Sequence, residues 1–121
     1  MQKVGIRSFA HKTKWVTTVH FVIDATSFRD PTGNEFLRKN CVNGLDAKVR
    51  EWIAEDSRFN AMMDTAVMLA QDADSSNIPW ISIGYMDHHG RWSSVALAEE
   101  AARRLKEKSF EVITVHHGLP A

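Results

Sequence analysis

The sequence has a single cysteine, Cys41, among its 121 residues. An internal disulfide is therefore excluded, and such sparing use of cysteine favours a reducing compartment. No run of 18 or more apolar residues occurs, which excludes an ordinary membrane-spanning helix. The first residues also lack the apolar stretch of a signal peptide. We therefore expect a cytoplasmic protein with no membrane partner.

An excess of charge of either sign is also absent, because 15 Lys and Arg residues balance 15 Asp and Glu residues. This neutrality counts against a dedicated nucleic-acid-binding domain, which is usually basic. The layout is uneven, however, since residues 1–23 contain basic residues and no acidic one. This segment could attract phosphate or RNA, or it could be an ordinary solvated strand pair and loop. An RNA-binding surface there would use Arg7, His11, Lys12 and Lys14.

The apolar pattern predicts a single α/β domain spanning residues 1–121. Alternating or continuous apolar runs indicate strands at residues 3–9, 16–23, 78–84 and 110–115, the first of them an edge or first strand. Helical spacing indicates helices near residues 45–53, 58–70 and 93–108, with Asp46 and Ser57 as capping residues of the first two. Residues 26–43 read as a long loop. The expected fold is a small mixed sheet of about four strands in the order β-β-α-α-β-α-β.

The last strand–helix–strand unit predicts where a site should lie. Its two strands should be parallel, so the loop of residues 85–94 and the histidines after the last strand leave the same edge of the sheet. The loop also leads into a helix N-terminus, which favours an anion. Arg91 can bind phosphate in a bidentate manner, and the serines can add donors or simply cap the helix. The candidate loop residues are Asp87, His88, His89, Gly90, Arg91, Ser93 and Ser94.

Residues outside this loop extend the predicted site. Lys12 and Arg29 would add positive charge if their loops reach the same edge, and His116 would add a hydrogen bond. An alternative is a histidine-based hydrolase or phosphoryl-transfer enzyme. Adjacent histidines diverge, however, and Cys41 lies outside the loop, where a thiolate nucleophile would be needed. We therefore assign no catalytic residue, no metal site and no cofactor, and we lean away from an enzyme.

Several segments, in the same order, resemble the C-terminal domain of the RapZ (RNase adapter protein) family. Residues 8–12 are similar to its Ser-Phe-Gly-x-Lys segment, and Asp24 with residues 29–31 to its aspartate-bearing strand and proline-containing loop. Residues 44–46 resemble its Gly-Leu-Asp helix start. Residues 81–84, the following loop and residues 94–95 resemble its Ile-Gly-Cys-Thr-Gly-Gly-x-His-Arg-Ser-Val segment. His116 falls near a histidine that follows the family's last strand.

The resemblance implies a regulatory, metabolite-sensing domain that binds a phosphorylated small molecule and RNA and takes part in homo-oligomerisation. The loop departs from the family pattern: it is longer and lacks the cysteine and most of the glycine, while Arg91, at a shifted position, could replace the family's arginine. No Gly-x-x-x-x-Gly-Lys-Ser/Thr motif occurs in the sequence, so nucleotide hydrolysis is not implied. An oligomerising interaction module without a small-molecule ligand is a further alternative.

Overall fold

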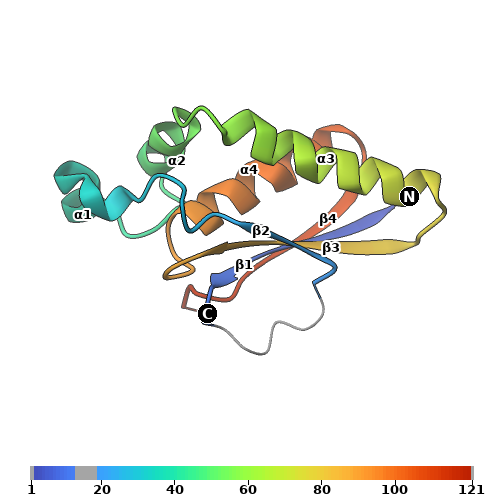
Figure 1. Ribbon diagram of the computed structural model, residues 1–121, viewed down its shortest axis with the longest axis horizontal. Helices are drawn as coiled ribbons and strands as arrows, with labels where there is room; N and C mark the ends of the chain where they lie inside the picture. The colour runs from blue at the N-terminus through green and yellow to red at the C-terminus, as the bar shows by residue number, and fades with distance from the viewer. Residues whose placement is uncertain (1, 13–18, 121) are drawn as a thin grey trace.

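The computed structural model describes residues 2–12 and 19–120. Its centre is a four-stranded sheet in the order β2-β3-β1-β4, in which every neighbouring pair is parallel (Figure 1). The strands are β1 (Lys3–Ala10), β2 (Phe21–Asp24), β3 (Trp80–Asp87) and β4 (Glu111–His116). The α/β class, the four strands and the order of the main elements are thus confirmed.

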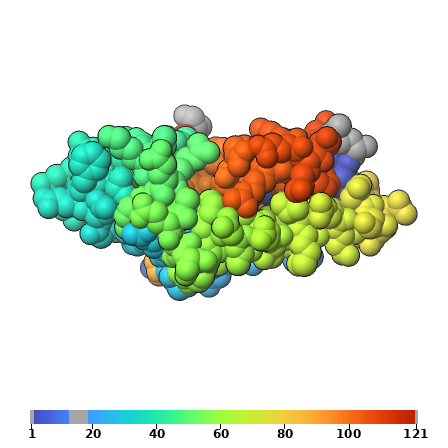
Figure 2. Space-filling view, turned by 90° about the horizontal axis from the view of Figure 1, so that it is seen from above, coloured from blue at the N-terminus to red at the C-terminus, as the bar shows by residue number. Residues whose placement is uncertain are grey.

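The helices gather on one side of this sheet (Figure 1). They are α1 (Glu35–Asn40), α2 (Ala47–Ala54), α3 (Phe59–Ser75) and α4 (Ser93–Glu107), with a short 3-10 helix, η1 (Pro31–Gly33). Figure 2 shows α3 and α4 side by side, and Arg104 of α4 contacts Asn60 and Asp64 of α3. In the described residues, no helix is long and apolar enough to cross a membrane.

Strand alternation places the core between the sheet and the helices. Val4 and Ile6 of β1 and Ile83 of β3 point to the helical side and are almost completely buried. From the other side of this core, α4 contributes Leu97 and Leu105, both fully buried. Burying aliphatic side chains of this size contributes about 1.5–3 kcal/mol each. The βαβ unit that carries the predicted loop therefore rests on the best-buried part of the molecule.

Four details differ from the sequence expectations. The sheet is parallel rather than mixed, because β3 lies between β2 and β1 and the first two strands form no hairpin. For the same reason β1 is a central strand and not an edge. The expected loop at residues 26–43 contains η1 and α1, which Asp30 and Asn34 cap. Finally, α3 begins at Phe59, and Asp56 rather than Ser57 accepts the hydrogen bond from the Arg58 amide at its start.

Candidate functional site

The carboxyl ends of all four strands meet at one edge of the sheet. In the strand register, Ala10 lies beside Asp87, and Ser8 lies beside His116. Asp24, the last residue of β2, lies beside Met86 of β3. Because β3 runs on to Asp87, the loop before α4 is shorter than expected, at residues 88–92. The expectation that this loop and the terminal histidines share an edge is confirmed.

The carboxylate of Asp87 occupies the position where the sequence analysis placed a ligand anion. Asp87 is buried, and it accepts hydrogen bonds from the amides of Ser94 at 2.8 Å, His89 at 3.0 Å and Gly90. It thereby satisfies free amide groups at the start of α4 and complements the helix dipole. The protein's own carboxylate thus already serves as the anion at this helix N-terminus.

Close packing of glycines holds the loop in place. Gly90 has a φ of 66°, and a Cβ there would stand 2.6 Å from the Ala10 nitrogen. Gly118, beyond β4, packs so tightly on the loop that a Cβ would stand 2.2 Å from the Gly90 oxygen. The Gly44 amide donates to the Arg91 carbonyl at 2.8 Å. The loop is therefore preorganised by β1, the C-terminal segment and the turn before α2.

Arg91 lies at a cleft on one side of this loop. The cleft has a volume of about 280 Å³, and its lining residues are Val42, Asn43, Arg91, Gly118, Leu119 and Pro120. The Arg91 Nε donates to the Val42 carbonyl at 2.7 Å, and the guanidinium lies 5.2 Å from the Trp92 ring centroid. Within residues 2–12 and 19–120, no other hydrogen bond or ion pair engages its two terminal nitrogens. A guanidinium whose Nε is fixed, and whose two terminal nitrogens are available as donors, therefore faces the cleft.

The other side of the loop carries exposed imidazoles. The His11 and His88 rings lie 5.2 Å apart, and those of His88 and His89 lie 6.4 Å apart. Hydrogen bonds from Thr26 lower the pKa of the nearby Asp24 carboxyl, with small contributions from the charges of His88 and His11. A notch of about 10 Å³ opens here, enough for about one water molecule. Ligands would contact these histidines from the surface and not in a cavity.

The two predicted serines are buried and are not exposed donors. Ser93 donates its hydroxyl to the Arg29 carbonyl at 2.6 Å. Ser94 is fully buried, and its hydroxyl has no hydrogen-bond partner among the described residues. The Arg29 guanidinium turns away from the loop, since it donates to the Trp52 carbonyl at 3.1 Å and pairs with Glu55 at 3.2 Å. The structure therefore does not bring the Arg29 side chain into the group around Arg91.

The structure describes three of the four residues predicted for the basic first segment. The His11 amide donates a hydrogen bond to the Asp87 carbonyl at 2.8 Å. Lys12, which is exposed, follows directly, so its backbone lies next to the loop. Arg7 is partly buried and bonds through its NH1 nitrogen to the His117 ring at 2.9 Å. Lys14 lies outside the described residues. Lys12 and His11 are thus the members of this group that the structure places, exposed, near the site.

The two terminal histidines point to opposite faces of the sheet. His116 bonds to the Ser8 hydroxyl through Nδ1 at 2.6 Å and to the Glu99 carboxylate through Nε2 at 2.9 Å. His117 contacts Arg7 on the other face, and burial, with the charges of Arg7 and His116, lowers its pKa. The Ser8–His116–Glu99 chain resembles a hydrolase triad in composition. Ser8 is completely buried, however, so the chain ties β1, β4 and α4 together instead of presenting a nucleophile.

Metal and thiol chemistry find no support in the described part of the chain. No three His, Cys, Asp or Glu side chains there are placed to hold a metal ion. Cys41 is buried, and burial, together with the nearby Asp46, raises the pKa of its thiol. A thiol in such surroundings is a poor nucleophile.

Sequence reasoning missed the residues that enclose the Arg91 cleft. Val42 contributes a backbone carbonyl, which no side-chain pattern reveals. The sequence pattern assigns no role to residues 118–120. Gly118 and Gly44 were the available signals, because glycine often marks a close backbone approach, but neither revealed its partner.

Comparison with known proteins identifies the family. The RapZ C-terminal domain model matches residues 2–120, so the chain belongs to the RapZ C-terminal domain family. A nucleotide-binding protein of Jannaschia sp. (strain CCS1) is 28% identical over 120 residues, covering 93% of this chain and 36% of that protein. One from Coprothermobacter proteolyticus is 28% identical over 116 residues, covering 93% and 39%. One from Xylella fastidiosa is 30% identical over 120 residues, covering 93% and 40%. The chain thus spans less than half the length of these relatives.

Proposed function

We propose that this chain is a regulatory domain that binds a phosphorylated small molecule at the carboxyl edge of its sheet, with the phosphate on Arg91. The related proteins from Jannaschia and Coprothermobacter are named nucleotide-binding proteins, which supports a phosphate-bearing ligand. The edge where the four parallel strands end is also the usual ligand position in open α/β sheets.

The observation that carries the proposal is the state of the Arg91 side chain. Its Nε is fixed on the Val42 carbonyl, while the terminal nitrogens are unengaged within the described residues. A guanidinium held in this way loses little entropy when it binds a phosphate through two parallel hydrogen bonds. The adjoining cleft of 280 Å³ is close to the lower end of the usual ligand-site range, roughly 300–1,000 Å³.

The proposal does not rely on the amides of α4, since Asp87 already accepts from that helix start. The phosphate would be held by side chains, with Arg91 as its principal partner. Lys12, His88 and His89 are exposed around the same loop and would contribute charge or hydrogen bonds to a ligand large enough to extend over it. Ser93 and Ser94 stabilise the loop from the interior, through hydrogen bonds to the Arg29 carbonyl and the Asp87 carboxylate.

Isothermal titration with a panel of nucleotides and sugar phosphates tests this proposal. For the tightest ligand of the panel, we expect Arg91→Ala to weaken binding by about tenfold or more, because a charge-assisted pair is lost. Arg91→Lys should retain part of the affinity, since a lysine supplies charge without the bidentate geometry. Lys106→Ala removes one exposed positive charge near the far end of α4 and should change nothing. Equal affinity for wild type and Arg91→Ala across the panel would reject the proposal.

A second candidate function, RNA binding, is favoured by one observation. His11 and Lys12 are exposed beside His88 and His89, so a short basic and aromatic surface continues from the Arg91 loop. Arg7 is not part of it, because its guanidinium holds His117. RNA binding should weaken with salt, with a slope of about −0.7 per phosphate contacted. In fluorescence anisotropy, His11→Ala combined with Lys12→Ala should weaken RNA binding; salt-independent binding would contradict an RNA function.

A further inference from the structure

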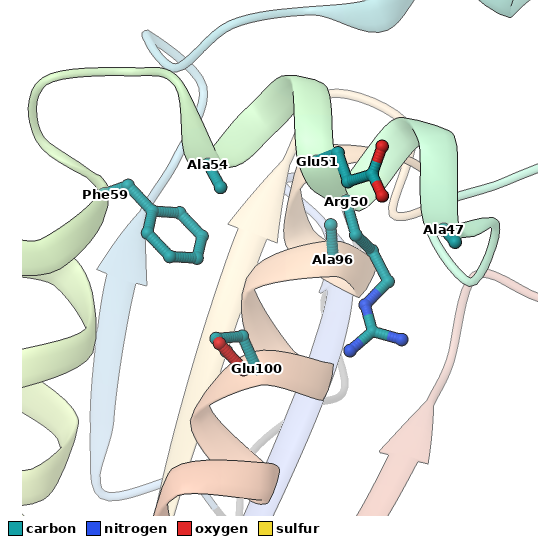
Figure 3. A pocket seen from close by; sticks show the side chains of 7 residues that line it. All are labelled: Ala47, Arg50, Glu51, Ala54, Phe59, Ala96 and Glu100. Carbon is teal, nitrogen blue, oxygen red and sulfur yellow. The ribbon is translucent and has the colours of Figure 1, made fainter.

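A second cleft opens on the helical side of the molecule, between α2, the start of α3 and α4 (Figure 3). Its volume is about 350 Å³, within the usual range for a small-molecule site. It is lined by Ala47, Arg50, Glu51, Ala54, Phe59, Ala96 and Glu100. None of these residues lines the Arg91 cleft, so the two clefts are separate.

Arg50 is the chemically distinctive group of this cleft. It is partly buried, and in the part of the chain that the structure describes it has no hydrogen-bond or ion-pair partner. The carboxylate of Glu100 is already bonded to Arg103 and lies 3.7 Å from Arg104. The Arg103 hydrogen bond is the main cause that lowers the pKa of Glu100, and the charges of Arg103, Arg104 and Arg50 lower it further. Figure 3 shows the Arg50 guanidinium and Glu100 on the same side of α4. The guanidinium thus lines the cleft with its hydrogen-bond donors available.

Alanine and phenylalanine side chains form the apolar part of the lining. Ala54 and Ala96 have short side chains that leave the space open, and the Phe59 ring closes one end of it (Figure 3). Phe59 is only 8% exposed, so its ring is a fixed surface and not a mobile one. A ligand that reaches Arg50 would therefore place its uncharged part against an alanine floor and an aromatic wall.

The local charge selects the kind of anion. Glu51 and Glu100 both line the cleft, together with Arg50. Arg50 is the cation among the lining residues, so it can balance a single negative charge, whereas the second charge of a dianion such as a phosphate monoester would find no further cation in the lining. A planar carboxylate also matches the paired donors of a guanidinium.

We propose that this cleft binds a monocarboxylate that carries a compact apolar or aromatic group, with the carboxylate on Arg50 and the apolar group against Phe59 and Ala54. The carboxylate can belong to a free organic acid or to the C-terminus of a peptide that ends in an apolar residue. Both sources present the same chemistry to Arg50. The cleft would then be an effector site, independent of the phosphate site proposed at Arg91.

The test uses phenylacetate as the probe and follows amide shifts of the isotope-labelled chain by NMR. We expect saturable shifts in α2, around Phe59 and in the first turns of α4. Shifts that are confined to residues 88–92 are not expected. Phenyl phosphate, a dianion, and benzyl alcohol, which has no charge, should each bind at least several-fold more weakly. Tighter binding of phenyl phosphate, or shifts that map elsewhere, would overturn the proposal.

Two variants locate the binding within the cleft. Arg50→Ala should weaken phenylacetate binding by about tenfold or more, and Arg50→Lys should restore part of it. Ala54→Leu should also block binding, because it fills the cleft without changing any charge. Lys48→Ala removes a positive charge from the same helix outside the cleft and should have no effect. Unchanged binding in folded Arg50→Ala protein, verified by its melting curve, would overturn the proposal.

Further arms separate the ligand sources and the two proposals. A short peptide ending in phenylalanine with a free carboxylate, compared with its C-terminal amide, shows whether a peptide terminus is the better ligand. If Arg50→Ala abolishes binding of the peptide with the free carboxylate, that result supports the site as strongly as loss of phenylacetate binding does. Arg91→Ala should leave phenylacetate binding unchanged. A failure of the phosphate proposal would therefore not affect this one, and the converse also holds.

Discussion

At the scale of the single residue, the backbone conformation at position 90 favours glycine. Its φ of 66° is one that residues with a Cβ adopt at a cost of about 1–2 kcal/mol. The backbone of Ala10 lies against it, so a side chain there would also force β1 and the loop apart. Both costs arise at the loop that presents Arg91.

Gly90→Ala should therefore lower the free energy of unfolding by about 2 kcal/mol or more, from backbone strain and contact with Ala10. Gly33→Ala is the matched control, because its φ is not positive and a Cβ there would meet nothing within 4 Å. Urea denaturation followed by circular dichroism measures both. A Gly90→Ala variant as stable as Gly33→Ala would show that the loop does not need this conformation.

His117 gives the molecule a pH dependence with a definite sign. Burial lowers the pKa of its imidazole, and the charges of Arg7 and His116 lower it further. The unfolded chain then binds a proton at a higher pH than the folded chain does, so stability rises with pH in this window. The contribution is complete above the ordinary value of 6.5 and is lost as the pH falls from there through the folded pKa.

His117→Gln should accordingly weaken the loss of stability on acidification. We expect the melting temperature of wild type to fall more than that of the variant between about pH 7.5 and about pH 5.5. Thermal melts across this range provide the measurement. Parallel curves for the two proteins would mean that His117 keeps its ordinary pKa in the folded state.

At the scale of the element, α4 depends on the last residue of β3. Asp87 accepts hydrogen bonds from the Gly90 and Ser94 amides, so the carboxylate ties the strand, the loop and the helix start together. Neither Ser93 nor Ser94 caps the helix through its hydroxyl. The stability of the site loop and that of α4 are therefore linked.

Asp87→Asn keeps the size of the side chain but removes the charge and one acceptor. It should lower the free energy of unfolding by about 1–2 kcal/mol, as loss of a helix cap does. Asp72→Asn removes an exposed carboxylate near the end of α3 and should have almost no effect. If chemical denaturation gives the same stability for both variants, Asp87 does not act as the cap.

Elements with a long, regular pattern could be predicted, and short ones could not. Both α4 and β3 have enough apolar residues at a regular spacing to be recognised. α1 has six residues and a single buried one, Leu37, so the loop-forming residues around it dominated the prediction. The preference of serine for caps predicts Ser57 as the cap of α3, but the N-cap residue is Arg58, and no side chain caps this helix start.

At the scale of the whole molecule, the sheet has two unlike faces. Ile83 points to the helical side and is fully buried, whereas Ile113 points to the opposite side and is 61% exposed. Isoleucines in two parallel strands of one sheet, β3 and β4, which flank β1, therefore contribute very differently to the stability of the fold. If residues 1–121 form a single domain, the burial of Ile83 stabilises all of it at once.

Ile83→Ala should lower the free energy of unfolding by about 2–5 kcal/mol, because it leaves a cavity in the core. Ile113→Ala should lower the free energy of unfolding by less than about 0.5 kcal/mol, apart from its effect on strand propensity. Guanidinium unfolding followed by both fluorescence and circular dichroism measures the two. Transitions that differ between the two probes would contradict the single-domain prediction.

By itself, the amino-acid sequence determined the α/β class, the main strands and helices, and the edge at which the predicted site residues meet. These follow from apolar periodicity and from the direction of a βαβ connection, which are properties of short stretches of chain. Only the tertiary structure decided which polar groups contact one another. Asp87 takes the start of α4, Arg29 turns to α2, and Arg91 faces a cleft closed by residues distant in sequence. Such pairings depend on contacts between remote segments, and no local pattern encodes them.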